Sequence, residues 1–323
     1  MNKKARWLAV QAIVSVALLV LLARRLDLEA FRALFARLPL WSYLLSFVVV
    51  LAGQVAYAWR WRLLLTSSGA DVALSVVIRQ YFIGIFLNNF LPSTVGGDLA
   101  KVYLLGRSCG YRKVTASVVL DRVLGIGLLA LCAAGVLWLL PLPSTILAGA
   151  RLAVSGVAVV SLIVLWLVTS GTGGLPGRVA WLGPRAVAVA LRLQRLRVEM
   201  AATVTPLVVG QAAAIVIGYF LAVGGVYVLL IRLLTGIAPP FLMTFGVAMT
   251  ISVLSNIPVS LNGLGLREQL HMSLFAPLGV QREVVVAVSL LLFGHVLITS
   301  LLGLLLWMQA PVLPSDARTQ AEA

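Results

Sequence analysis

The sequence predicts an all-α polytopic membrane protein with about six full spans, two broken or re-entrant segments and an inverted repeat. The first observation is composition: the 323 residues are 61% hydrophobic and 11% charged, whereas a soluble domain carries roughly 25% charged residues. The second is a mean hydropathy of +1.07. The third is that the apolar stretches run unbroken, without the alternation typical of a membrane β-barrel.

Six stretches have the length of about twenty apolar residues that a helix needs to cross a bilayer. They are 7–23, 41–59, 117–140, 148–168, 206–231 and 284–308. The first follows Lys3 and Lys4, as the core of a cleavable signal peptide would. However, Arg24 and Arg25 stand where a small-residue cleavage site should be. We therefore expect an uncleaved signal-anchor helix.

Two further apolar stretches are interrupted. The stretch 76–100 breaks at Pro92 and Gly96–Gly97, and 241–276 breaks across the polar run Asn256–Gly265. Backbone in hydrocarbon must satisfy its own hydrogen bonds, so such breaks survive only inside protein or beside a water-filled cavity. Proline and glycine are also common in ordinary membrane helices. Two matched breaks, each with asparagine and an acid nearby, favour a functional interpretation.

A basic connection over 169–205 divides the chain into two membrane halves, 1–168 and 206–323. If both broken segments (76–100 and 241–276) are re-entrant, most Lys and Arg lie on the side of the N-terminus, which is then predicted to be cytoplasmic. The two broken segments then enter from opposite sides, which is the pattern of an inverted repeat with a site near the midplane. A full crossing by either segment would reverse the orientation downstream.

The formal net charge of +15 would suggest nucleic-acid binding in a soluble protein. Here the basic residues lie mainly in short connections, where they set topology and meet anionic headgroups, so we expect membrane lipids as partners and no nucleic acid. The two cysteines, Cys109 and Cys132, lack metal-ligand or disulfide spacing. Metalloprotease, CxxC and Ser/His/Asp patterns do not occur, so we expect no metal, cofactor or catalytic residue.

Three acidic residues lie in or beside membrane stretches, each near a cation. The pairs are Asp98 with Lys101, Asp121 with Arg122, and Glu268 with Arg267. A charge within the bilayer costs several kcal/mol unless it is paired or hydrated, so such residues are functional candidates. The alternative is an interfacial salt bridge that anchors a helix end, and for Asp121 and Arg122 the two interpretations weigh about evenly.

The predicted substrate site combines these charges with asparagines, which can bind phosphate or hydroxyl groups, and with glycines, which allow close backbone approach. Its members are Asn88, Asn89, Pro92, Gly96, Gly97, Asp98, Lys101, Asp121, Arg122, Asn256, Asn262, Gly263, Gly265, Arg267 and Glu268. A helix beginning near Gly97 would direct free N–H groups toward an anionic headgroup. His271 lies one turn from Arg267 and is either a packing residue or a proton relay. His295 is more simply a packing residue.

Four ordered motifs carry a resemblance that covers nearly the whole chain. They are R-W-R-L-L-L at 60–65, G-x-F-x-N-N-x-L-P-S-T-x-G-G-D-x-x-K at 84–101, D-R-x-x-G at 121–125 and P-x-S-x-N-G-L-G-x-R-E at 258–268. This pattern resembles the lysylphosphatidylglycerol synthase transmembrane, or flippase-like, family. In fused members the membrane region accompanies a soluble aminoacyl-transferase domain that attaches lysine to phosphatidylglycerol, and it is held to move the product between leaflets. Because this sequence shows no transferase domain, the resemblance implies a stand-alone module. Lys101 stands where the family often has arginine.

We therefore expect a plasma-membrane translocator for an anionic or phosphate-bearing lipid, either a phospholipid or an isoprenoid-linked one. Lys101, Arg122 and Arg267 would contact phosphate. Asp98 and Glu268 would position those cations or an amine of the headgroup. One alternative is a membrane transferase acting on a polyprenyl-phosphate or phospholipid, with Asp98 as base or metal ligand. Another is a non-transporting partner of a separate lipid-modifying enzyme.

Overall fold

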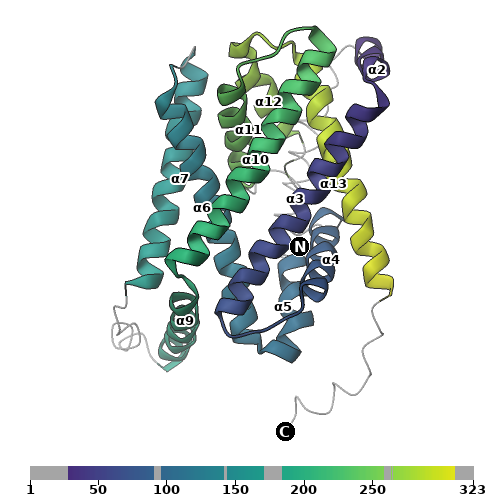
Figure 1. Ribbon diagram of the computed structural model, residues 1–323. Coiled ribbons are helices and arrows are strands. Elements are labelled where there is room, and N and C mark those ends of the chain that lie inside the picture. The colour runs from purple at the N-terminus through teal and green to yellow at the C-terminus, as the bar shows by residue number, and fades with distance from the viewer. Residues whose placement is uncertain are drawn as a thin grey trace, which may run out of the picture.

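The computed structural model describes residues 28–90, 96–141, 144–170, 184–257, 263 and 265–309 (Figure 1). Over these residues the chain forms eleven α-helices and a short 3₁₀ helix, and no strand. The predicted all-α polytopic membrane fold is thereby confirmed.

Five helices are long and apolar enough to cross a membrane: α3 (Leu40–Ser67), α6 (Tyr111–Leu139), α7 (Thr145–Thr169), α10 (Pro206–Thr235) and α13 (Arg282–Met308). They match five of the six predicted spans, and the sixth, 7–23, lies outside the described residues. Only 11% of the α7 span is buried against 56% of the α13 span. The α7 helix is therefore peripheral, whereas α13 is central.

The first broken segment forms α4 (Leu74–Phe90) and α5 (Gly96–Cys109). The Lys113 ammonium, just inside α6, donates to the carbonyl of Gly69, just beyond α3, at 3.3 Å. The helices that flank the pair therefore meet at one end of the bundle, and α4–α5 returns to the end that it left. Gly69 and Gly110 sit at the two outer ends of this hairpin with φ of 76° and 88°, a region that favours glycine.

The second broken segment forms α11 (Phe241–Ser255) and α12 (Leu266–Phe275), followed by the 3₁₀ helix Ala276–Leu278. Leu234 near the end of α10 and Gln281 just before α13 line the same surface pocket, so this hairpin also returns to its starting end. Figure 1 shows α11 and α12 at the end opposite to α4 and α5. The two hairpins thus enter from opposite ends, while a two-fold relation between whole halves stays a prediction.

The remaining helices lie at the ends of the bundle. At the same end as α11 and α12, beside α13, is α2 (Leu28–Arg37), and at the opposite end is α9 (Pro184–Thr203) (Figure 1). The predicted 169–205 connection therefore contains a helix. The cytoplasmic orientation of the N-terminus stays a prediction, as does the division into two halves.

Two packed regions stabilise the bundle. The larger cluster joins α6, α10, α11 and α13 through residues such as Leu137, Leu230, Met249 and Val285. A smaller cluster surrounds Trp61 between α3, α4, α5 and α6 at the other end. The polar cavity described below touches both clusters, so apolar packing holds its walls on either side.

Glycine allows α13 to approach α4 closely. A methyl group on Gly303 would collide with the backbone carbonyl of Phe82, and backbone atoms cannot move aside as a flexible side chain can. Small residues at such crossings let membrane helices pack backbone to backbone.

We expect Gly303→Ala to destabilise the protein by about 1–3 kcal/mol, because overpacking costs that much when neighbours cannot give way. Gly294→Ala is the matched control on the same helix, since its methyl group would meet no atom within 4 Å. That control should stabilise slightly, because alanine favours a helix over glycine by roughly 0.5–1 kcal/mol. Thermal unfolding in detergent measures both, and equal effects would contradict the proposed contact.

Candidate functional site

A cavity of about 380 Å³ lies among α3, α4, α5, α6, α11 and α13. Its lining comprises Gln54, Tyr57, Arg60, Tyr81, Ile85, Asn88, Asn89, Lys101, Asp121, Arg122, Gly125, Ile126, Leu129, Asn256 and Val296. The structure thus brings together six of the residues that the sequence predicts for the site, from both broken segments. They are Asn88, Asn89, Lys101, Asp121, Arg122 and Asn256.

The Asn88 side chain, which lines the cavity, forms a hydrogen bond across the break between α4 and α5. The helix α5 begins at Gly96, and the Gly97 N–H donates to Asn88 Oδ1 at 2.8 Å. This N–H, expected to face a substrate, is therefore used internally. A methyl group on Gly97 would collide with the carbonyl of Gly84, so position 97 requires glycine for the two helices to cross. Pro92 lies outside the described residues.

Asp98 binds two cations. Its Oδ1 lies 3.4 Å from Lys101 Nζ, as the i+3 spacing predicts, and its Oδ2 lies 2.8 Å from Arg122 Nε. The Lys101 ammonium also lies 4.4 Å from the ring centre of Tyr81 and 5.1 Å from that of Trp61. Cation–π attraction and the shared carboxylate together stabilise a lysine that is almost fully buried.

Asp121 pairs across helices with Arg60. Arg60 Nε lies 2.8 Å from Asp121 Oδ1, and Arg60 Nη2 donates to the Asp121 carbonyl at 3.4 Å. The neighbouring cation Arg122 pairs instead with Asp98, since adjacent residues of a helix do not face each other. Asp121 is also no helix-end anchor: it lies ten residues after Tyr111, or about 15 Å along α6.

The charges at this cavity do not balance. Arg60, Lys101 and Arg122 supply three cations, whereas Asp98 and Asp121 supply two carboxylates. The excess positive charge lies around Asp98, because Lys101 and Arg122 share this one carboxylate. Arg122 is the accessible one of the three, with 43% of its side chain exposed against 8% for the other two.

The charges of the second broken segment are paired among themselves. Glu268 is fully buried; its Oε2 accepts from the N–H of Gly265, the N-cap residue of α12, at 2.8 Å, and its Oε1 lies 2.7 Å from Arg267 Nη2. The Arg267 guanidinium lies 3.8 Å from the ring centre of Phe293. Glu268 therefore caps α12.

Both histidines are held by hydrogen bonds. His271 Nδ1 lies 2.7 Å from the Arg267 carbonyl and its Nε2 lies 2.6 Å from the Tyr227 hydroxyl. Because a carbonyl only accepts, Nδ1 donates and the Tyr227 hydroxyl donates to Nε2. His295 Nε2 lies 2.9 Å from Ser46 Oγ. Both residues thus join helices, which agrees with the packing interpretation.

The remaining predicted site residues do not line the cavity. The described residues that surround it do not include Gly96, Gly97, Asp98, Arg267 or Glu268, although Asp98 pairs with two residues that do line it. Gly263 and Gly265 adopt φ of 73° and 77° within the second break, and Asn256 is the member of that break that reaches the cavity. Asn262 lies outside the described residues.

Sequence reasoning missed the α3 wall of the cavity, which includes Gln54, Tyr57 and Arg60. The sequence places Arg60 in the R-W-R-L-L-L motif but not in the predicted site, because the predicted span ends at residue 59. A signal was present: these three polar residues recur at intervals of three in an apolar stretch, which places them along one side of a helix.

A family model described as "Lysylphosphatidylglycerol synthase TM region" matches residues 8–303. A curated relative, the "UPF0104 membrane protein PH1989" of Pyrococcus horikoshii, is 31% identical over 118 residues. That alignment covers 35% of this chain and 35% of the relative, so it spans about a third of the relative's length. No solved structure matches the chain. The chain belongs to the lysylphosphatidylglycerol synthase transmembrane-region family of membrane proteins.

Proposed function

We propose that this protein moves an anionic or phosphate-bearing lipid between the leaflets of the plasma membrane. The observation that carries the proposal is a cavity among membrane helices that is lined by three cations, which share only two carboxylate partners, Asp98 and Asp121. An uncompensated charge in a low-dielectric region is costly. An incoming anion removes that cost, so the cavity favours a negatively charged headgroup.

The charge excess also favours a particular number of charges on the headgroup. One phosphodiester carries a single negative charge, which neutralises the excess cation at Asp98. Arg122 offers a planar fork that suits phosphate, while Lys101 offers a point charge. A diphosphate-linked lipid would leave the cavity with net negative charge. Among lipids of otherwise similar shape, the phosphodiester class is therefore the preferred substrate.

Translocation would use the two hairpins that enter from opposite ends of the bundle. Transporters with interrupted helices in each half bind substrate where the breaks meet and expose it alternately to either side. In this protein Asn88 of the first break and Asn256 of the second share the cavity. The headgroup would occupy this polar region while the acyl chains stay in lipid, and transport would be downhill or ion-coupled.

Arg60 and Asp121 serve the site differently in this proposal. They neutralise each other and are both almost fully buried. A methyl group on Gly125 would lie only 2.7 Å from Arg60 Nη2, so the guanidinium packs directly on the α6 backbone. The pair therefore positions α3 against α6 and keeps the wall of the cavity in place.

We expect Arg122→Gln to slow lipid transfer about tenfold to a hundredfold, because a hydrogen bond to a charged group contributes about 1.5–3 kcal/mol. The measurement is reduction of fluorescent phosphatidylglycerol by dithionite in proteoliposomes. Arg107→Gln is the control: this exposed arginine donates to the Tyr103 hydroxyl and does not line the cavity.

Three results would contradict the proposal. Equal rates of lipid transfer for Arg122→Gln and Arg107→Gln would show that Arg122 does not bind the lipid. A lipid product of changed mass would indicate a transferase. A wild-type protein that transfers no lipid, but co-purifies with a lipid-modifying enzyme, would indicate a non-transporting partner.

The variants Arg60→Leu and Asp121→Leu should each cost about 3–5 kcal/mol of stability, because each leaves a buried charge unpaired. The double variant should recover most of that loss and should retain transfer, since the charge excess at Asp98 is unchanged. Thermal unfolding in detergent and the proteoliposome assay measure the two effects. A stable double variant without transfer would show that the pair itself binds substrate.

A further inference from the structure

Helix α9 lies across one end of the bundle, below the ends of α6 and α7 in Figure 1. Arg197 on α9 donates through Nε to the carbonyl of Val168, at the end of α7, at 3.2 Å. Trp166 in the same turn of α7 is exposed, as is Tyr111 at the first position of α6. Exposed Trp and Tyr at the ends of spanning helices mark the membrane–water interface, so α9 lies at the level of lipid headgroups.

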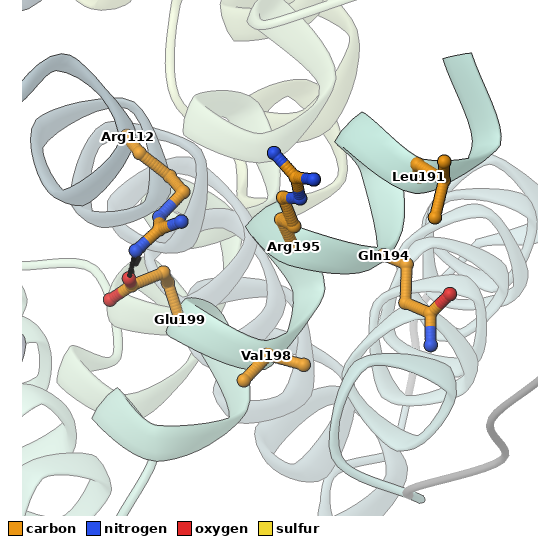
Figure 2. Close-up of a pocket in the computed structure, with 6 residues that line it drawn as sticks. All are labelled: Arg112, Leu191, Gln194, Arg195, Val198 and Glu199. Atoms are coloured by element: carbon orange, nitrogen blue, oxygen red, sulfur yellow. Dashed lines mark hydrogen bonds and ion pairs between the residues drawn. The ribbon is translucent and has the colours of Figure 1, made fainter. Parts of the chain in front are cut away.

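A pocket of about 330 Å³ lies between α9 and the first turn of α6. It is lined by Arg112, Leu191, Gln194, Arg195, Val198 and Glu199 (Figure 2). Leu191 and Val198 provide apolar surface, while the two arginines provide donors. A small amphiphile with an anionic end matches this combination of surfaces.

The arginines of the pocket are not equivalent. Arg112 Nη2 lies 2.6 Å from Glu199 Oε1, and Figure 2 shows this contact. Arg195 has no ion-pair partner within the part of the chain that the structure describes. Because one glutamate faces two arginines, the pocket carries one excess positive charge, and Arg195 holds it.

The surface around the pocket is apolar as well as basic. Val189, Leu193 and Val198 on α9 are exposed by 55%, 55% and 64%, and Arg192 is exposed between them. In water these apolar side chains would stay exposed, whereas at the boundary between lipid headgroups and acyl chains they would be buried in lipid. Apolar residues with arginines on one short helix are typical of a helix that binds an anionic leaflet surface.

We infer that the α6–α9 pocket binds the phosphate of an anionic phospholipid from the leaflet that α9 faces. Arg195 binds the phosphate, while Glu199 holds Arg112 in place beside it. Leu191 and Val198 contact the glycerol and the first carbons of the acyl chains. This site is separate from the charged cavity and does not depend on lipid transport.

The experiment isolates the pocket by using the Arg122→Gln background, in which the charged cavity is weakened. Purified protein in mixed micelles is titrated with phosphatidylglycerol, phosphatidylcholine or inorganic phosphate, and bound lipid is counted by native mass spectrometry. We expect phosphatidylglycerol to bind best. Added Arg195→Gln should weaken that binding about fivefold, and less so at high salt, because exposed charges are screened.

Two matched variants make the result specific. Arg195→Lys keeps the charge and should keep most of the preference for phosphatidylglycerol. Arg107→Gln removes a charge at the same end of the bundle, outside the pocket, and should leave binding unchanged. Equal binding of phosphatidylcholine, full competition by inorganic phosphate, or an equal loss in Arg107→Gln and Arg195→Gln would each overturn the inference.

Discussion

The ion pairs that cross between helices are the interactions on which the rest of the site depends. Asp98 on α5 binds Arg122 on α6, and Asp121 on α6 binds Arg60 on α3. A carboxylate in a membrane bundle is costly unless it is paired or hydrated, and here each of these two carboxylates is paired with a cation. These pairs therefore fix how α3, α5 and α6 lie against one another, and the cavity is the space that remains between them.

The two broken segments both carry an acidic residue in the first turn of their second helix, but the two acids have different partners. In the first, the acid at the start of α5 binds two cations that line the cavity, Lys101 and Arg122. In the second, the acid in the first turn of α12 turns back onto its own helix and caps it. An inverted arrangement of hairpins is thus combined with an unequal distribution of charge, and the first hairpin supplies most of the polar surface.

The sequence was informative about helices and breaks, because apolar length and Pro/Gly interruptions are local properties. It located five spans and both hairpins, and the i+3 spacing identified the pair of Asp98 and Lys101. It could not assign Asp121 to Arg60, since that pairing depends on which helices are neighbours. Hydropathy also ended the second span too early: α3 continues to Ser67, because a helix persists through polar residues when protein surrounds them.

The glycine crossing within the first hairpin has a mechanical consequence. Since Gly84 and Gly97 bring the two backbones into contact, α4 and α5 pack as a single unit. Gly69 and Gly110, which both have positive φ values, lie at the two ends of this unit. If this unit moved relative to α6, Lys101 would move with Asp98, whereas Arg122 would remain on α6. The ion pair between Asp98 and Arg122 would therefore have to break during any such movement.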